Sequence, residues 1–271
     1  MKKILLFTVL MLLQKATIYA QVIEGTVKDA TTKANLPYVN VGIIGKGIGT
    51  VTDAEGAYKI VLNNNDADSL KVSMIGYRSQ NFSVADLKKH FGPLNIALEA
   101  GVIPLKEVKI YNHDFKQVVL GNTTQSKSTD AGFTSNELGN EIGAVIKIKK
   151  APTFLKQFNA SLAHSASDSV KLRLNFYSVK DGLPDKIIQQ QNIFVTVKKG
   201  QDKISVDLTP YHIVVEDKFF VSLEWIQNSP GHGLMFSASL LSSAIISRET
   251  SQAKWEKVGL AGVGFNVSAE Y

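Results

Sequence analysis

A glycine-rich stretch beside a cation, Gly45-Lys46-Gly47-Ile48-Gly49, could form a loop that binds phosphate. A phosphate-binding loop needs a strand, then glycines, then Gly-Lys-Ser/Thr, then a helix whose N-terminus faces the phosphate. Here Gly47 follows Lys46, and the next segment has the pattern of another strand. A dinucleotide-binding fingerprint fails for the same reason. The sequence therefore favours glycines that serve a connection between strands, where unusual dihedral angles or close backbone approach are needed.

The next polar group, Asp53-Ala54-Glu55-Gly56, has Asp at the first and Gly at the fourth position, as type I turns prefer. We expect residues 50–52 and 57–61 to form the arms of a hairpin closed by this turn. Asp53 and Glu55 could also bind calcium, but the spaced set of oxygen ligands of a calcium loop is missing. An Asp that bonds its own backbone is ordinary turn chemistry, so Asp53 and Gly56 are predicted to be structural.

Hydrolytic chemistry has no recognisable motif in this chain. None of the histidines has Glu three residues later, so the His-x-x-Glu pair of zinc carboxypeptidases is missing, as are HExxH, GxSxG and any cysteine nucleophile. His212 has Glu216 four residues later, but a catalytic zinc wants three protein ligands, so this pair is interpreted as surface. We predict no catalytic residue, metal ligand or cofactor-binding residue. A dispersed Ser/His/Asp site stays open, because such sites are recognised by geometry.

Aromatic residues are the other candidates, because they could stack on sugar rings. Trp225 shares its parity with the apolar residues 219, 221 and 223, which predicts core packing. Trp255 has a polar setting, and the alternative to exposure is a small apolar cluster under a loop. Tyr211 follows Pro210 and is expected to close a corner. Trp255, Tyr211 and Tyr177 are the candidate ligand contacts.

The chain begins with Lys2 and Lys3, an apolar run over residues 4–13 and the small residue Ala20. This pattern predicts a secretory signal peptide over residues 1–20, cleaved after Ala20. No later run reaches the roughly 18 apolar residues of a spanning helix. Without cysteine, disulfides and a lipid anchor on an N-terminal cysteine are excluded. We expect export to the periplasm, the outer-membrane periphery or the cell surface.

The formal net charge of +6 comes partly from the predicted signal peptide, and its removal leaves 27 basic against 24 acidic residues. The lysines are scattered, whereas a nucleic-acid site needs a basic stripe with stacking aromatic residues. Nucleic acid is therefore not an expected partner.

Strand patterns cover most of the remaining chain. Ser83, with Asp86 three residues later, predicts one capped helix that ends before Gly92-Pro93. Residues 121–140 are rich in Ser, Thr, Gly and Asn and are expected to form a long loop. In KLRLNFY, residues 171–177, Leu172, Leu174 and Phe176 alternate with Lys171, Arg173 and Asn175, which predicts one buried and one solvent-facing side. Other strands are expected at 24–29, 38–44, 49–52, 58–62, 69–75, 94–98, 105–110, 142–148, 193–197, 204–208, 219–226, 234–240 and 262–269.

One family resemblance emerges from EGTVKDATTKANLPYVNVGIIGKGIGTVTDAEGAYKI, residues 24–60, together with DSLKVSMIGYRSQ, residues 68–80. As a set, these residues closely resemble the carboxypeptidase-like regulatory domains of exported Bacteroidota proteins. The resemblance covers about residues 22–98. It implies a transthyretin-like β-sandwich of seven or eight strands that acts as an accessory, often fused to outer-membrane transporters or peptidases. Residues 105–110 also look like the segment that follows this domain in TonB-dependent transporters, but the rest is too short for a barrel of about 22 strands.

The sequence thus predicts an all-β protein, with a transthyretin-like β-sandwich followed by a jelly-roll-like β-sandwich. The expected division is a signal peptide at 1–20, the regulatory domain at 21–98, a linker strand and loop at 99–141 and the second sandwich at 142–271. The predicted function is a non-catalytic exported protein that engages a glycan or another envelope protein. A hydrolase with an unrecognised site in the second domain and a structural spacer remain the alternatives.

Overall fold

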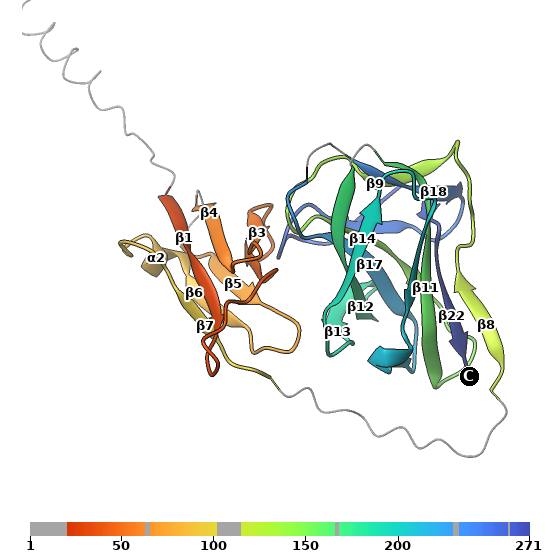
Figure 1. The fold of residues 1–271 in the computed structure, drawn as a ribbon, viewed down its shortest axis with the longest axis horizontal. Helices are drawn as coiled ribbons and strands as arrows, with labels where there is room; N and C mark the ends of the chain where they lie inside the picture. Colours follow the sequence, from red (N-terminus) through yellow and green to blue (C-terminus); the bar gives the residue numbers. More distant parts are fainter. Residues whose placement is uncertain (1–20, 63–65, 102–114, 166–167, 230–232, 260) are drawn as a thin grey trace, which may run out of the picture.

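The computed structural model describes residues 21–62, 66–101, 115–165, 168–229, 233–259 and 261–271. The predicted signal peptide at 1–20 and the predicted strand at 105–110 lie outside these ranges. Within them, strands form almost all of the regular structure, which confirms the all-β class. Figure 1 shows two β-domains side by side.

The first domain is a sandwich of two small sheets. Strands follow the order β4-β1-β7 in one sheet and β3-β2-β5-β6 in the other. The sequence builds this core by alternation: in β4, Tyr58, Ile60 and Leu62 are buried, whereas Lys59 and Val61 are exposed. Strand β1 pairs with β7 in parallel and with β4 antiparallel. The strands are β1 (Gln21–Asp29), β2 (Asn40–Ile43), β3 (Gly49–Val51), β4 (Ala57–Leu62), β5 (Ser69–Ser73), β6 (Gln80–Ser83) and β7 (Ile96–Leu98).

The turn at Asp53 does not close a hairpin, so that prediction is wrong. Strand β3 pairs with β2, whereas β4 pairs with β1 in the other sheet. The buried hydroxyl of Thr52 donates to Leu36 O at 2.9 Å and accepts from Val39 N at 2.8 Å, which ties the end of β3 to the β2 side. The turn therefore carries the chain across the sandwich, from one sheet to the other.

The predicted helix is shorter than expected. Helix α2 (Val84–Leu87) has four residues, and Ser83 makes no side-chain capping hydrogen bond. Ser83 is instead the last residue of β6, paired with Ser69 of β5. Ser83 therefore occupies the N-cap position as the end of a strand, and its side chain does not cap the helix.

The second domain is a larger sandwich. One sheet has the order β13-β12-β17-β10-β19-β20, with β14 also paired to β12; the other has the order β21-β18-β11-β22-β8, with β15, β16 and β9 as side branches. Large apolar residues, Phe158, Phe176, Trp225 and Phe265 among them, fill the core between the sheets. The strands are β8 (Gln117–Gly121), β9 (Asp130–Phe133), β10 (Glu141–Ile146), β11 (Thr153–Ser165), β12 (Ser169–Lys180), β13 (Leu183–Ile187), β14 (Ile193–Lys198), β15 (Lys203–Asp207), β16 (Val214–Val215), β17 (Phe219–Trp225), β18 (Leu234–Leu240), β19 (Ile245–Arg248), β20 (Glu256–Val258), β21 (Ala261–Val263) and β22 (Phe265–Glu270).

The expected boundary between linker and second domain is wrong. Strand β8 pairs with β22 and β9 pairs with β18, so the second domain already includes residues from Gln117 onward. Two apolar anchors, Leu120 and Phe133, enter the core from this stretch, although polar residues dominate its composition. Part of the expected loop at 121–140 is therefore strand.

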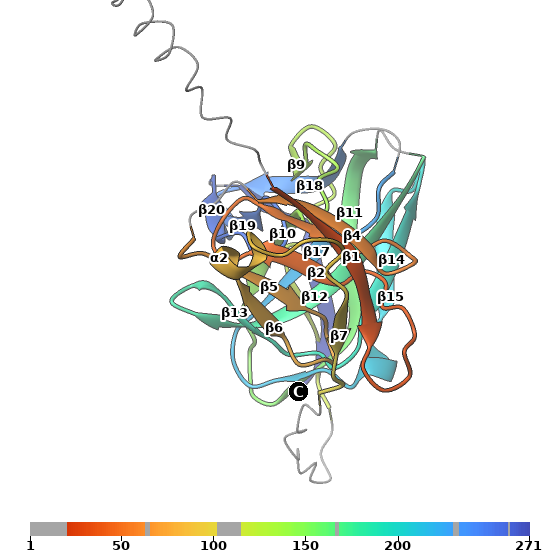
Figure 2. The same ribbon diagram turned by 90° about the vertical axis from the view of Figure 1, so that its left-hand side faces the viewer.

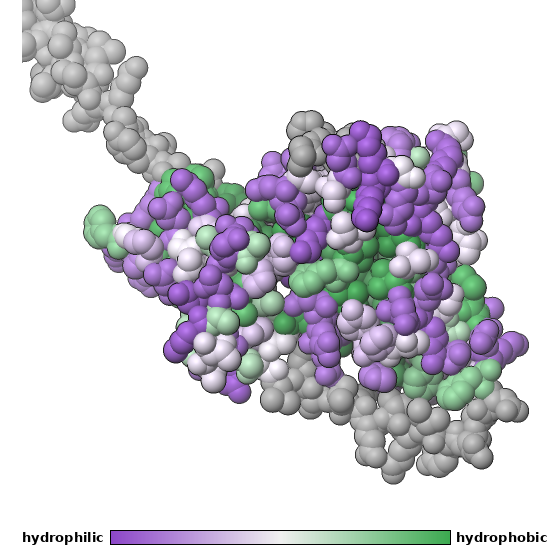
Figure 3. Space-filling model, viewed as in Figure 1, coloured by the Kyte–Doolittle hydropathy of each residue, from purple (hydrophilic) through white to green (hydrophobic). Residues whose placement is uncertain are grey.

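Hydrophilic residues cover most of the face seen in Figure 3, and apolar residues gather in the middle of the second domain, between β14 and β11. Among the described residues, no helix has the length and apolar character needed to cross a membrane.

Candidate functional site: the cleft between the domains

A row of charged residues crosses four strands of the second domain's first sheet. In the pairing register, Arg173 of β12 lies opposite Glu224 of β17, Glu224 lies opposite Glu141 of β10, and Glu141 lies opposite Arg248 of β19. Because side chains alternate across a strand, all four project from the same face, away from the core. Register therefore lines up the charges in the order plus, minus, minus, plus. We call these four residues the charged row.

Close ion pairs neutralise both ends of the charged row. Arg173 donates to Glu224 Oε2 from Nε at 2.9 Å and from Nη2 at 2.7 Å. Arg248 Nη2 lies 2.5 Å from Glu141 Oε2 and 3.9 Å from Glu224 Oε1. Asn175 follows Arg173 by two residues on the same face of β12, and its amide bridges Glu141 and Glu224 by donating to each carboxylate at 2.9 Å. The four charges thus form one connected network.

The sheet face that carries this network was predicted to face solvent, and that prediction is wrong. Arg173 and Asn175 are only 2% and 1% exposed, and Glu141 and Glu224 are fully buried. The first domain covers them: Arg173 donates to Tyr38 O at 2.8 Å and to the side-chain oxygen of Asn40 at the start of β2. Figure 2 shows β2 and β5 in front of β12 and β17. Alternation revealed the polar face, but not that another domain covers it.

Burial and the neighbouring charges act in opposite directions on the pKa values of Glu224 and Arg248. Burial opposes ionisation of Glu224, but the charges of Arg173 and Arg248 outweigh it and hold the pKa of that carboxyl below its usual range. Burial likewise disfavours the Arg248 cation, yet Glu141 raises the pKa of Arg248. Burial raises the pKa of Tyr177, and the Glu141 charge raises it further. Glu224 and Arg248 are therefore ionised, and Tyr177 stays a neutral donor, 3.0 Å from Glu141 Oε1.

Two glycines of the first domain allow the backbone of the second domain to pack directly against the backbone of the first. Gly42 and Gly49 are paired across β2 and β3. A Cβ on Gly42 would lie 2.1 Å from Ser251 O, and one on Gly49 would lie 2.3 Å from the same atom. Nearby, Gly45 N donates to Gln252 O at 2.8 Å. Gly42, Gly45 and Gly49 thus form a docking surface for the segment after β19. Lys46 does not lie in a phosphate-binding loop.

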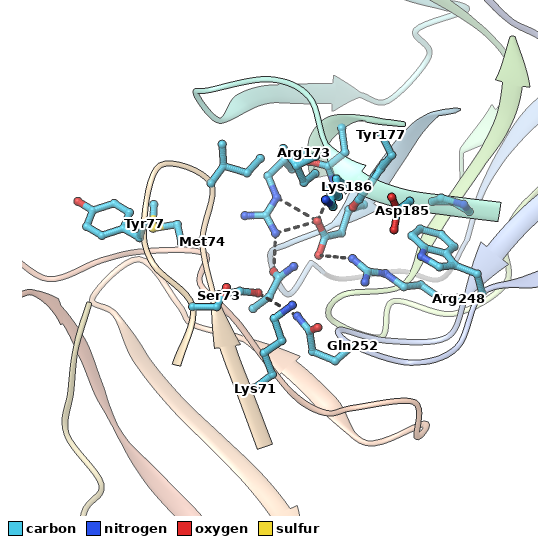
Figure 4. Close-up of a pocket in the computed structure, with 18 of the residues that line it drawn as sticks. Lys71, Ser73, Met74, Tyr77, Arg173, Tyr177, Asp185, Lys186, Arg248 and Gln252 are labelled. Atoms are coloured by element: carbon cyan, nitrogen blue, oxygen red, sulfur yellow. Dashed lines mark hydrogen bonds and ion pairs between the residues drawn. The ribbon is translucent and has the colours of Figure 1, made fainter. Parts of the chain in front are cut away.

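Above the charged row the two domains leave a cleft of about 540 Å³. Figure 4 shows side chains from both domains pointing into it. The first domain contributes Lys71 and Ser73 of β5 and the loop that reaches Tyr77. The second domain contributes residues of the charged row, the β13 residues Asp185 and Lys186, and the segment from Gln252 to Trp255. Gln252 Nε2 donates to Ser73 Oγ at 2.9 Å and joins the two walls.

The structure brings two of the three candidate aromatic residues together in this cleft. The rings of Tyr177 and Trp255 meet edge to face, with centroids 5.7 Å apart. The guanidinium of Arg248 lies over the Trp255 ring, 4.6 Å from its centroid. Tyr211 lies elsewhere, in the short 3-10 helix Thr209–Tyr211 against the core. Trp225 is fully buried in the core, as its parity predicted.

The comparison with protein families gives one match, to the CarboxypepD_reg-like domain, over residues 23–110. The first domain is a CarboxypepD_reg-like domain. The match confirms the resemblance found in the sequence and extends beyond its expected end at residue 98. The comparison with curated proteins gave no match to this chain.

The remaining candidate residues lie outside the cleft. In the CarboxypepD_reg-like domain, Asp53 Oδ1 accepts from Glu55 N at 3.0 Å and Ala57 N at 2.8 Å, and Gly56 has a φ of +75°. His212 adopts a left-handed conformation after the 3-10 helix, with a φ of +47°. Across the described residues, no group of three or more His, Asp or Glu side chains could hold a metal ion.

Sequence reasoning missed most of the polar residues of the cleft. Lys71 lies in a predicted strand and Arg248 in an unpredicted one, and neither stood out by spacing. Glu141 and Glu224 are separated by long stretches of sequence from the residues they pair with. The one available signal was a polar residue at every second position of KLRLNFY, which marks a polar face but not its partner.

Proposed function

We propose that this protein is an exported, non-catalytic binding protein of the cell envelope and that it holds a glycan in the cleft between its domains. One observation carries this proposal: polar side chains of both domains and the Trp255–Tyr177 pair line the same cleft. Its volume of about 540 Å³ is within the roughly 300–1,000 Å³ of ligand sites.

The chemistry of the lining favours a saccharide over an apolar ligand. Most small-molecule sites are lined mainly by apolar side chains with a few polar groups. This cleft instead presents amides and hydroxyls, such as Asn175, Gln252 and Ser73, with aromatic surface at one side. Sugar rings carry hydroxyl groups around their edges and apolar C–H faces, and so match this combination.

A non-catalytic role agrees with the state of Glu224. Glycoside hydrolysis usually needs two carboxyl groups, of which one donates a proton. Glu224 is fully buried and its pKa is held low, which leaves it unsuited as a proton donor. None of His90, His164 and His212, the histidines that the structure describes, lines the cleft. CarboxypepD_reg-like domains are themselves non-catalytic β-sandwich domains.

The envelope location is the part of the proposal that the N-terminal sequence supports. CarboxypepD_reg-like domains are typically extracytoplasmic, and residues 1–20 have the pattern of a signal peptide. Another envelope protein is the second class of partner to test, because the same cleft could take a protein segment.

Binding of residues 21–271 to a glycan array, together with capture of partners from an envelope extract, tests the proposal. We expect saccharide binding that Trp255→Ala weakens. The matched control is Phe91→Ala, because Phe91 is 94% exposed and lies outside the cleft. Circular dichroism of both variants checks that they remain folded. Binding of no saccharide and no envelope protein would contradict the proposal, as would equal effects of the two variants.

A further inference from the structure

The cleft is lined by Lys71 of the first domain and Arg248 of the second. Lys71 of β5 is partly buried, and within the described part of the chain the structure gives it no ion pair or side-chain hydrogen bond. Burial lowers the pKa of Lys71, and the Arg248 cation lowers it further. Lys71 and Arg248 thus repel one another across the cleft (Figure 4). An anion between them would relieve this repulsion.

Two buried residues that line the same cleft have polar atoms without a hydrogen-bond partner among the described residues. Arg248 is 8% exposed, and its Nε has no hydrogen-bond acceptor among the described residues. Asn175 is 1% exposed, and its Oδ1 has no donor among them. Leaving buried polar groups unpaired is costly, so such groups mark places where a ligand can bond. One is a donor and the other an acceptor, as recognition of a carboxylate beside a hydroxyl group requires.

Arg173, by contrast, is fully engaged. It bonds Glu224, Tyr38 and Asn40, and its Nη1 also reaches Asn192 Oδ1 at 3.3 Å. Its hydrogen bonds to Tyr38 and Asn40 join the second domain to the first, and no N–H donor of Arg173 is left free for a ligand. The candidates for ligand recognition are therefore Lys71 on one wall and Arg248 on the other, with the exposed Lys186 as a further cation of the lining.

We propose that the cleft binds an acidic saccharide whose carboxylate lies between Lys71 Nζ and the Arg248 guanidinium. This inference rests on the proposed glycan-binding function and names the class of glycan. The rest of the sugar ring lies toward Asn175 and the exposed part of Trp255, which supply polar and apolar contacts. Arg248 is already paired with Glu141 through Nη2, and its Nε is the guanidinium atom that lacks an acceptor among the described residues.

The test compares uronic-acid polysaccharides with the same polymers after chemical reduction of their carboxyl groups to alcohols. Pectate, alginate, hyaluronan and chondroitin form the panel, and affinity electrophoresis of residues 21–271 measures binding. Lys71→Gln removes the first domain's cation from the cleft. Lys59→Gln is the matched control, because Lys59 is an exposed lysine of β4 in the same domain and outside the cleft.

We expect at least one native polymer to bind, and its carboxyl-reduced form to bind about tenfold or more weakly, since a lost charge-assisted hydrogen bond has an effect of this size. Lys71→Gln should weaken binding of the native polymer by a similar factor, and Lys59→Gln should leave it unchanged. Equal binding of reduced and native polymers, or equal effects of Lys71→Gln and Lys59→Gln, would overturn the inference.

The two proposals fail in distinguishable ways. If only a neutral glycan or an envelope protein binds, the acidic-saccharide inference is wrong while binding by the cleft still stands. If Trp255→Ala has no effect on any ligand found, or no ligand is found at all, the proposed function fails with it.

Discussion

Replacing Arg173 with methionine is expected to destabilise the protein strongly, because Arg173 connects the charged row to the first domain. Its side chain is 2% exposed and makes hydrogen bonds of 2.7 and 2.9 Å to Glu224. It also satisfies the Tyr38 carbonyl at 2.8 Å across the domain interface. Methionine fills similar space but supplies neither charge nor donors.

The magnitude follows from what the substitution leaves behind. Glu224 would remain fully buried, with Asn175 at 2.9 Å and the more distant Arg248 at 3.9 Å. Removing one partner of a buried ion pair costs about 3–5 kcal/mol of unfolding free energy. The double substitution Arg173→Met/Glu224→Leu leaves no unpaired carboxylate there, so it should be less destabilising than Arg173→Met alone.

Urea unfolding at neutral pH, followed by tryptophan fluorescence, measures these differences. Arg78→Met is the matched control: Arg78 lies 3.5 Å from Glu99, but the two side chains are 75% and 67% exposed. Loss of such a surface pair costs about 1 kcal/mol or less. If Arg173→Met costs no more than Arg78→Met, or if the double variant is the least stable of the set, the account of the buried network is wrong.

Three further predictions test the pH dependence, the docking surface and the N-terminus. The pKa of Glu224 is lower in the folded protein than its usual value, so its stabilising effect is complete above the usual pKa and is lost as pH falls through the folded-state pKa. Glu224→Gln should therefore reduce the acid dependence of stability, measured by thermal unfolding between about pH 3 and pH 7. Gly49→Val places a side chain against Ser251 O and should separate the domains, seen as a larger radius of gyration by small-angle X-ray scattering, whereas Thr50→Val in the same strand should not. Intact mass of the secreted protein should show Gln21 as the first residue, and a retained leader would contradict the signal-peptide prediction.

Regular alternation made much of the fold predictable. Strands such as β4 and β12 follow a two-residue period that can be read without knowing their partners. Strand β11 (Thr153–Ser165) was missed although it pairs with β22, β18, β15 and β16. Its pairing register shifts between Leu155 and Gln157 and again between Leu162 and His164. Each irregularity interrupts the alternation, so no single period describes the strand.

The site was less predictable, because it depends on contacts between distant residues. Arg173 and Glu224 are 51 positions apart, and they meet because β12 and β17 pair in one register. A local pattern gives the face on which a side chain lies, but the register between strands is a property of the whole sheet. Trp255 had two interpretations from sequence, and the structure combines them: it packs on Tyr177 and Phe220 and still lines the cleft.

The interface between the domains is better suited to fixing orientation than to maximising stability. Burying ion pairs carries a desolvation cost that their attraction only partly offsets, so a packed apolar interface would hold two domains at least as well. Charged partners tolerate few alternative alignments, however, and here Arg173 must meet Glu224, Tyr38 and Asn40 together. That requirement fixes Lys71 of the CarboxypepD_reg-like domain opposite Arg248 of the second domain. Neither domain alone has both cations, so on this reasoning the regulatory-like domain supplies half of the proposed binding site.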